Sequence, residues 1–455
     1  MKEAMEMRMV GWVCFGWIDK CDHLEVSEDP FVGRWLRYDD PLAIGRLRKY
    51  YKAPANRFRY KEHVALCDSA GPSYLGWTPP LSSVAPPVTT YMKMNGNGAT
   101  NTVSHRISFD CVASLKTLTP HITCLALHRN LLYAASLNLI NVFHASHYTH
   151  IDAFNHNNPS SGFVKSIAFA DSKVFTAHQD CKIRVWLITP HSKRHRLLLT
   201  LPTLNDRLRR FMLPSNYVHV RRHKRSLWIQ HCDTVSGLAL NQGLMYSVSW
   251  DKSFKIWDVS GNNYRCVESV KAHEDAINAV AVSRGGTVYT ASADGSIRVW
   301  ERDEKVNKYR LVSCVEKQKS TVNALALKGD GRVVFSGGCD GAICMWERKE
   351  GSLNDMVLVE TVRGHSGAIL CLVKVEGWDW IVSGSGDQTV RIWGKERGRS
   401  GYVCKAVLEG HEKPIKSLVA VSSSGGAANG VVTLFSGSLD GDIKVWKLEG
   451  VGLKF

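Results

Sequence analysis

The sequence predicts an all-β protein in which seven similar sheets form a closed ring. Two observations carry this prediction: one spacing of Asp and Trp recurs along the 455 residues, and alternating apolar segments precede it. In six segments, five residues separate an Asp from a Trp, and a Ser or Thr lies four residues before the Asp. The six pairs are Asp180 and Trp186, Asp251 and Trp257, Asp294 and Trp300, Asp340 and Trp346, Asp387 and Trp393, and Asp440 and Trp446. Such an interval is typical of tandem arrays of one supersecondary unit.

Each repeated unit reads as four short β-strands. Apolar and polar residues alternate upstream of the Asp, as in residues 277–282 and 322–327, and this period of two predicts strands. From Trp257 onward, successive Trp residues are 43, 46, 47 and 53 positions apart, which matches the length of a four-stranded unit. In four units a His lies four residues before the alternating segment: His231, His273, His365 and His411.

A seventh, degenerate unit lies upstream of the other six. Its first strand is expected at residues 122–127, and Tyr133, Leu137 and Phe143 replace the Ser or Thr, the Asp and the Trp. Seven units lie within the usual range of four to eight for a closed ring of sheets.

The two ends of the repeat array predict how the ring closes. Nine residues follow Trp446, too few for an outer strand of the last unit. Residues 111–117 precede the first unit and alternate in the required way, so we expect them to complete the sheet that holds Trp446. Such an exchange leaves no open sheet edge in the ring.

On these repeats the sequence resembles the WD40-repeat family, over about residues 104–449. The resemblance implies a seven-bladed WD40 β-propeller in residues 104–455. Residues 1–103 show no repeat and lie outside the resemblance, and they are expected to be a poorly ordered N-terminal extension and linker. Among the six Trp residues of the repeat, only Trp257 is followed directly by an Asp, Asp258. Within the family, residues 216–231 and 247–251 are most similar to the plant WD-repeat proteins called JINGUBANG-like.

The resemblance also implies a buried chain of hydrogen bonds in each complete blade. The expected chains are His231, Ser247, Asp251 and Trp257; His273, Thr290, Asp294 and Trp300; His365, Ser383, Asp387 and Trp393; and His411, Ser436, Asp440 and Trp446. A Ser-His-Asp hydrolase would use such a triad once, whereas this arrangement recurs, so it is expected to be architectural. Ser160 and Gln318 stand where two further blades would carry the His. These two blades and the Phe143 blade are expected to open more easily than the others.

No catalytic, cofactor or metal site is predicted. The 13 Cys residues include no C-x-x-C pair, and no phosphate-binding loop or H-E-x-x-H motif occurs. These features favour reduced cysteines in an intracellular protein. The protein is expected to be a monomer of the cytoplasm or nucleus. The longest apolar run, residues 9–18, is too short for a transmembrane helix, which needs about 20 residues.

Two sets of residues are candidates for binding partners. In the family, the residue before the repeated Asp usually lies on the top face of the ring, and Trp250 among these is the expected aromatic anchor, unless it packs under a neighbouring loop. The candidates on this face are Trp250, Gln179, Cys339 and Leu439. The second set comes from residues 191–226, where ten Lys or Arg accompany one acidic residue, and its candidates are Arg209, Arg210, Arg221, Arg222, Lys224 and Arg225.

The basic segment has two interpretations. It reads as a long loop followed by an outer strand at residues 217–220 and 226–229. It is either a solvated loop or an electrostatic docking site for an acidic protein, a nucleic acid or an anionic lipid.

The function expected from these features is a non-enzymatic protein–protein interaction scaffold. The JINGUBANG-like resemblance implies a plant regulator of pollen germination or of transcription-factor activity. One alternative is a substrate receptor of a cullin-type ubiquitin ligase, because residues 334–349 resemble the sixteen-residue box of such receptors, with Lys349 in the basic position. Another is a propeller that binds nucleic acid through its basic insertion.

Overall fold

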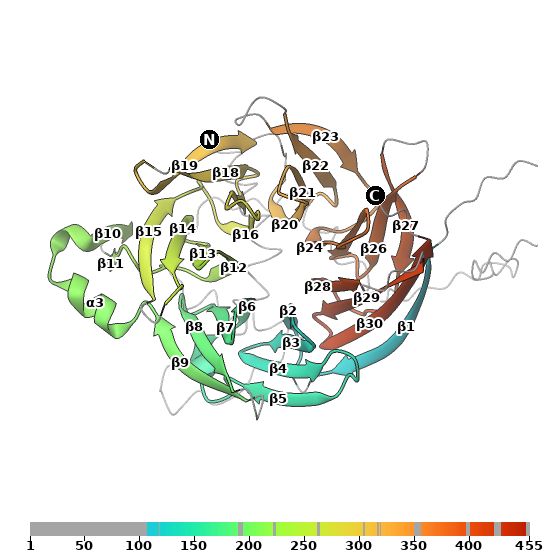
Figure 1. Cartoon of the computed structure of the whole chain (residues 1–455), viewed down its shortest axis with the longest axis horizontal. Helices are drawn as coiled ribbons and strands as arrows, with labels where there is room; N and C mark the ends of the chain where they lie inside the picture. Colours follow the sequence, from blue (N-terminus) through green and yellow to red (C-terminus); the bar gives the residue numbers. More distant parts are fainter. Residues whose placement is uncertain are drawn as a thin grey trace, which may run out of the picture. The chain divides into compact units, whose positions relative to one another are not determined.

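Seven four-stranded antiparallel sheets surround a central axis in the computed structural model (Figure 1). The structure describes residues 107–451, except 118, 190–193, 222–223, 262–263, 304, 316–317, 319, 350–355, 397–400 and 423–428. Residues 1–103, the expected extension and linker, lie outside the described residues. Within the described part of the chain, no helix is long and apolar enough to cross a membrane.

The blades are numbered in chain order, and the strands of each are given from the axis outward. Blade 1 contains β2 (Ile122–His128), β3 (Leu131–Ser136), β4 (Leu139–His144) and β5 (His150–Phe154). Blade 2 contains β6 (Val164–Ala170), β7 (Lys173–His178), β8 (Ile183–Ile188) and β9 (His195–Leu201), after the short helix η1 (Pro159–Ser161). Blade 3 contains β12 (Val235–Asn241), β13 (Leu244–Ser249), β14 (Ser253–Asp258) and β15 (Arg265–Lys271).

The next three blades repeat this order. Blade 4 contains β16 (Ile277–Val282), β17 (Val288–Ser292), β18 (Ile297–Asp303) and β19 (Lys308–Val315). Blade 5 contains β20 (Val322–Lys328), β21 (Val333–Gly338), β22 (Ile343–Arg348) and β23 (Met356–Val362). Blade 6 contains β24 (Ile369–Lys374), β25 (Trp380–Ser385), β26 (Val390–Lys395) and β27 (Tyr402–Leu408).

Blade 7 is assembled from both ends of the repeat array, which confirms the predicted closure. Its strands are β28 (Ile415–Ser422), β29 (Asn429–Ser438), β30 (Asp442–Val451) and β1 (Ser108–Lys116). β1 pairs antiparallel with β30, and Cys111 lies opposite Trp446. The innermost strands of neighbouring blades also contact one another around the whole ring, and β28 contacts β2. The ring is therefore closed without a free edge between its first and last blades.

The apolar core is divided into seven clusters, each between two neighbouring blades. The cluster between blades 2 and 3, for example, joins Phe175 and Val185 to Val235 and Trp257. The cluster between blades 7 and 1 contains Phe143, the residue that replaces Trp in blade 1. Each Trp of the repeat, or Phe143 in its place, thus packs into the interface with the preceding blade.

Two bulges recur in every blade and were not predicted from the sequence. One lies at the second residue of the innermost strand, and the other lies where the outermost strand passes the Trp or Phe143. Bulges increase the local twist of a sheet. Four of the innermost bulge residues donate a side-chain hydrogen bond to the next blade's first backbone carbonyl: Thr123 to Val164, Ser236 to Ile277, Asn278 to Val322 and Asn323 to Ile369.

The outer strand predicted at residues 217–220 and 226–229 is wrong. The outermost strand of blade 2 is β9, in which Leu197 lies opposite Trp186 and Leu201 is buried. This Leu-rich segment can bury apolar surface on the blade, whereas the later arginine-rich segment cannot. The later segment instead forms β10 (Tyr217–Arg221) and β11 (Lys224–Leu227), which pair only with each other.

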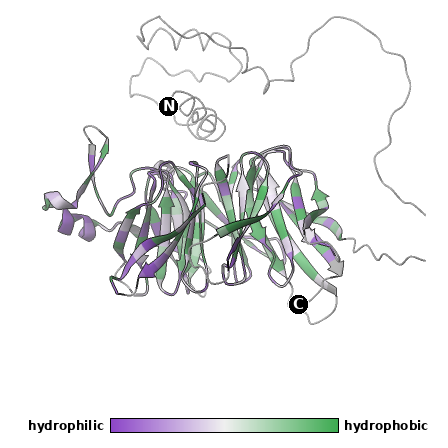
Figure 2. Ribbon diagram, turned by 90° about the horizontal axis from the view of Figure 1, so that it is seen from above, coloured by the Kyte–Doolittle hydropathy of each residue, from purple (hydrophilic) through white to green (hydrophobic). Residues whose placement is uncertain are grey.

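The helix α3 (Leu204–Phe211) and the short helix η2 (Pro214–Asn216) precede this hairpin. Residues 203–228 are called the rim appendage below. Figures 1 and 2 show that the appendage projects outward from the side of the ring.

Candidate functional site

Four blades contain a continuous chain of hydrogen bonds between His, Ser or Thr, Asp and Trp. In blade 3, His231 Nδ1 lies 3.0 Å from Asp251 Oδ2, and His231 Nε2 lies 2.8 Å from Ser247 Oγ. The Trp257 indole N–H donates to the same Ser247 oxygen at 2.8 Å. The same connections occur in blades 4, 6 and 7, through His273, Thr290, Asp294 and Trp300; His365, Ser383, Asp387 and Trp393; and His411, Ser436, Asp440 and Trp446.

The protons in these chains have one consistent arrangement. An ionised Asp only accepts, so His231 donates through Nδ1–H and accepts the Ser247 hydroxyl proton at Nε2. Burial is the main cause that lowers the pKa of His231, although Asp251 partly opposes it. Burial alone would raise the pKa of Asp251, but the His231 contacts and the hydrogen bonds from Ser253 and Cys232 outweigh it, and the pKa is lowered. The imidazole is therefore neutral and the carboxylate is charged.

This arrangement predicts loss of stability in mild acid. Burial lowers the pKa of His231, His365 and His411, and lowers that of His178 strongly. An unfolded chain restores a value of about 6.5, so below that pH the unfolded state binds protons that the folded state does not. The free energy of unfolding should fall by up to about 1.4 kcal/mol per pH unit for each such His.

The measurement is thermal unfolding between pH 8 and pH 5. The unfolding temperature should be nearly constant above pH 7 and should fall steadily toward pH 5. His178→Gln removes one of the buried imidazoles, so its curve should be less steep. The lowered pKa of the four Asp residues adds a further loss only when the pH falls below their unfolded value of about 4. An unfolding temperature that does not change between pH 7 and pH 5 would contradict neutral buried imidazoles.

Blade 2 keeps its chain through a residue that was not predicted. Ser160 is exposed and takes no part. His178, on the same strand as Thr176, places Nε2 2.7 Å from the Thr176 hydroxyl, which also accepts from the Trp186 indole at 2.9 Å. Asp180 pairs with Arg184 instead of a His, at 2.7 Å. The missed signal is the residue type at the end of β7: His178 stands where the other repeats carry Ser, Gly or another small residue.

Blades 1 and 5 lack the complete chain. In blade 5, Trp346 donates to Ser336 at 2.9 Å, while the buried Oε1 atom of Gln318 has no hydrogen-bond partner among the residues that the structure describes. In blade 1, the Tyr133 hydroxyl meets His195 of blade 2 at 3.0 Å. His195 Nδ1 lies 2.8 Å from Asp152, so blade 1 has a Tyr-His-Asp network that connects it to its neighbour. The expectation that the incomplete blades open more easily stays a prediction.

The hydrogen-bond chains cannot act on a substrate from these positions. Ser247, Thr290, Ser383 and Ser436 are fully buried, and each hydroxyl is already shared between a His and a Trp. A nucleophilic Ser must reach a carbonyl carbon, and these cannot. Their role in the molecule is to fix the third strand of each blade against its neighbours.

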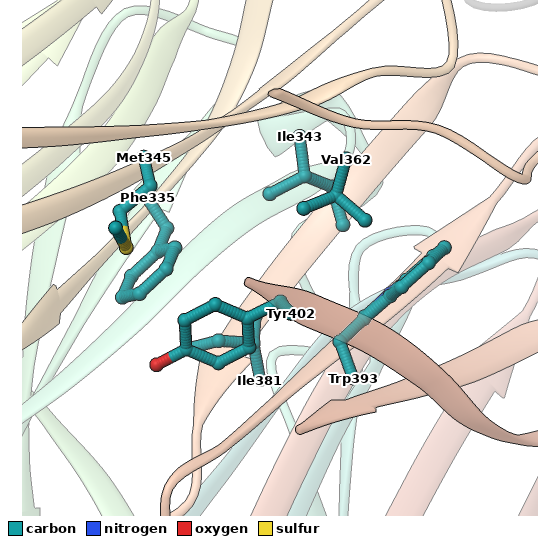
Figure 3. A pocket seen from close by; sticks show the side chains of 7 residues that line it. All are labelled: Phe335, Ile343, Met345, Val362, Ile381, Trp393 and Tyr402. Carbon is teal, nitrogen blue, oxygen red and sulfur yellow. The ribbon is translucent and has the colours of Figure 1, made fainter. Parts of the chain in front are cut away.

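A small void lies between blades 5 and 6 (Figure 3). Its volume is about 10 Å³, and only apolar surface faces it. A water molecule needs about this volume and polar partners, so the void suits neither water nor a larger ligand. The lining residues are Phe335, Ile343, Met345, Val362, Ile381, Trp393 and Tyr402.

The repeated Asp also fixes the turn that presents the top-face candidates. In blade 3, Asp251 Oδ1 accepts from the Ser253 backbone N–H at 2.9 Å, and Lys252 has a positive φ of 71°. The residue before the Asp therefore lies at the turn between the second and third strands. Because this turn has the same place in every blade, Gln179, Trp250, Cys339 and Leu439 lie on one face of the ring, which is called the top face below.

Trp250 is half-buried at the junction of blades 2 and 3. The Lys165 ammonium of β6 lies 5.4 Å from the centre of the Trp250 ring and 4.9 Å from that of Phe163. A cation this close to an aromatic ring is attracted to it. Gln179 accepts from the Phe163 backbone N–H at 3.2 Å, so it supports the same junction. Cys339 accepts from Asn323 at 3.3 Å in blade 5.

The basic candidates lie apart from the top-face set, on the rim appendage. Arg209 and Arg225 are exposed there. Arg210 is turned toward the body of the appendage, where it meets Asp206 at 3.2 Å and lies over the Trp228 ring at 5.5 Å. Arg221 and Lys224 belong to β10 and β11, and Arg222 lies outside the described residues.

Comparison with known proteins identifies the repeats. The family described as "WD domain, G-beta repeat" matches residues 264–301, 310–347, 356–394 and 402–447. These four segments are similar to WD40 repeats. Each one begins in the outermost strand of one blade and ends near the Trp of the next, so the match covers the third strand and the Asp turn that the hydrogen-bond chains share.

Relatives share the repeat at low identity. The chain is 27% identical over 188 residues to the "DENN domain and WD repeat-containing protein SCD1" of Arabidopsis thaliana, covering 41% of this chain and 14% of that protein. It is 26% identical over 226 residues to the "F-box/WD-40 repeat-containing protein At5g21040" of the same plant, covering 48% of this chain and 40% of that protein. It is 28% identical over 169 residues to the "Small ribosomal subunit protein RACK1y" of Oryza sativa, covering 36% of this chain and 45% of that protein. The chain spans less than half the length of each of these relatives.

A solved structure shares the fold of the ring. A chain of the "Crystal Structure of Mitotic Checkpoint Complex" aligns with a TM-score of 0.58 at 16% identity, covering 78% of this chain and 97% of that one. At this identity, the likeness shows the shared propeller fold alone.

Proposed function

We propose that the protein is a non-enzymatic scaffold that binds other proteins through the top face of its WD40 ring, with Trp250 as the anchor. The observation that carries this proposal is that the repeated residues and the variable residues occupy different places in the ring. The repeated His, Ser, Asp and Trp are used inside the blades, whereas the residue at each top-face turn differs from blade to blade. Fold alone does not give function, so the proposal rests on this face and its aromatic anchor.

Trp250 has the properties of an anchor. It is large and amphipathic, it remains half-buried rather than covered, and Lys165 holds one side of its ring. Its backbone N–H donates to the Thr234 carbonyl at 3.1 Å, which holds the turn in place before a partner arrives. A preorganised aromatic residue loses little freedom on binding.

The narrower role follows from the sequence resemblance. We propose a plant regulator of the JINGUBANG-like group, in the cytoplasm or nucleus, that acts in pollen germination or on transcription factors. The similarity of residues 216–231 and 247–251 supports this role, and Trp250 belongs to the second segment. Residues 334–349 form β21, its turn and β22 as in the other blades, so their geometry does not distinguish a ubiquitin-ligase receptor from other rings.

Trp250→Ala tests the proposal. Removal of an interface anchor typically weakens binding by about 2 kcal/mol or more, which is roughly thirty-fold. We expect proximity labelling in plant tissue to recover a set of partners with the unchanged protein and to lose most of them with Trp250→Ala. The matched control is Trp378→Ala, because Trp378 is a half-buried Trp at a turn between first and second strands, on the opposite face. If both variants recovered the same partners, Trp250 would not be the anchor of the top face.

A further inference from the structure

The helix of the rim appendage turns its polar side toward the protein. The Thr203 side chain caps α3 by accepting from the Asp206 backbone N–H at 3.1 Å. Asp206 is buried and pairs with Arg210, which also lies over Trp228. The Asn216 amide donates to the Arg210 carbonyl at 3.0 Å. The side of α3 that faces the hairpin is therefore held by polar contacts.

The opposite side of α3 is apolar and exposed. Leu204, Leu208 and Phe211 follow the i, i+4, i+7 spacing of one helix face, and they are 67%, 52% and 50% exposed. Met212 and Leu213, directly after the helix, are 72% and 56% exposed. A surface helix of a globular protein normally buries its apolar face. In α3 the polar face is turned toward the hairpin instead, and a contiguous apolar surface remains uncovered among the described residues.

Arginines flank this apolar surface. Arg207 and Arg209 on α3 and Arg225 on β11 are exposed. In the part of the chain that the structure describes, no carboxylate forms an ion pair with any of the three. A second copy of the chain would bring arginines against arginines, so self-association through this surface is disfavoured.

The shape of the appendage indicates what can cover it. It projects from the ring as a helix and a hairpin (Figures 1 and 2), so its apolar side chains stand on a protrusion. A protein partner would need a groove of matching shape, whereas a lipid surface deforms around a protrusion. Basic residues beside exposed Leu, Phe and Met are the pattern of segments that lie in the interface of an anionic bilayer.

We propose that the rim appendage binds anionic lipid surfaces. Leu204, Leu208 and Phe211 enter the boundary between headgroups and acyl chains, and Met212 and Leu213 join them. Arg207 and Arg209 remain at the level of the phosphates, since long basic side chains can extend their charge toward the polar layer. This recruitment to a membrane goes beyond the scaffold function and does not depend on it.

Flotation with vesicles tests the proposal, using the full chain and residues 104–455, which contain every strand of the closed ring. The probes are vesicles of phosphatidylcholine alone and vesicles with 30% phosphatidylserine. We expect both proteins to bind the anionic vesicles at least ten-fold more strongly, and Leu208→Glu/Phe211→Glu to reduce that binding at least ten-fold. Arg207→Glu/Arg209→Glu should reduce the binding and its dependence on salt.

The matched control is Val306→Glu/Val359→Glu, which adds the same two charges at exposed apolar positions on blades 4 and 5. It should bind the anionic vesicles like the unchanged protein. The proposal is overturned if residues 104–455 bind both vesicles equally or neither, or if the control and Leu208→Glu/Phe211→Glu bind alike. Binding by the full chain alone would also overturn it, because the lipid contact would then lie outside the appendage.

Discussion

A chain that begins at residue 118 should lose most of its stability compared with one that begins at residue 107. The shorter chain lacks β1, which forms eight residue pairs with β30. Each lost ladder hydrogen bond removes about 1 kcal/mol, so the total approaches the 5–15 kcal/mol that stabilises a typical domain. It also leaves β30 as an open edge beside Trp446, and such edges aggregate.

The two chains are compared by size-exclusion chromatography and thermal unfolding. We expect the chain from residue 107 to be a single cooperative species, and the chain from residue 118 to aggregate or to unfold at least 10 °C lower. A synthetic peptide of residues 107–117 should bind the open edge as an added strand and restore part of the loss. Equal unfolding temperatures for the two chains would show that β1 contributes nothing to closure.

Ser383→Ala should destabilise the protein more than the same change at Ser336. Both hydroxyls are fully buried. Ser383 accepts from Trp393 at 2.8 Å and meets His365 at 2.7 Å, whereas Ser336 accepts only from Trp346 among the described residues. Each buried polar group left without a partner costs about 1–3 kcal/mol. We expect a loss of about 2–5 kcal/mol for Ser383→Ala and about 1–3 kcal/mol for Ser336→Ala.

Chemical denaturation of the two variants measures this difference directly. Ser383→Thr is the conservative control, since Thr290 of blade 4 stands at the same position and bonds to the equivalent His and Trp. The free energy of unfolding of Ser383→Thr should stay close to that of the unchanged protein. If the two Ala variants lose the same free energy, the bond to His365 does not stabilise the blade.

The parts of the fold that depend on repetition could be predicted. Six copies of one spacing set the number and order of the strands. Only the last sheet lacked an outer strand, so the strand at residues 111–117 could complete that sheet alone. The hydrogen-bond chains were expected from the same repeats through the family resemblance. Each of these features is specified several times over, so a change in one copy does not hide it.

The parts that occur once could not be predicted in the same way. His178 and the network of Tyr133, His195 and Asp152 join positions that no repeat relates, and only their distances in space reveal them. Within the rim appendage, the sequence predicts an outer strand of blade 2 at residues 217–220 and 226–229, and the structure places it elsewhere. The outer strand of a blade is the first segment after the third strand that can pair with it. In blade 2 this segment is the apolar β9, which pairs with β8.

The joining of β1 to β30 has a consequence for synthesis. Ser108 and Glu449, which lie opposite each other, are 341 residues apart in the chain. At about 5–20 residues per second, a ribosome needs roughly 20–70 s to make the stretch between them. During that time the first strand has no partner, and six blades emerge before the last can accept it. The nascent protein therefore spends most of its production as an open arc.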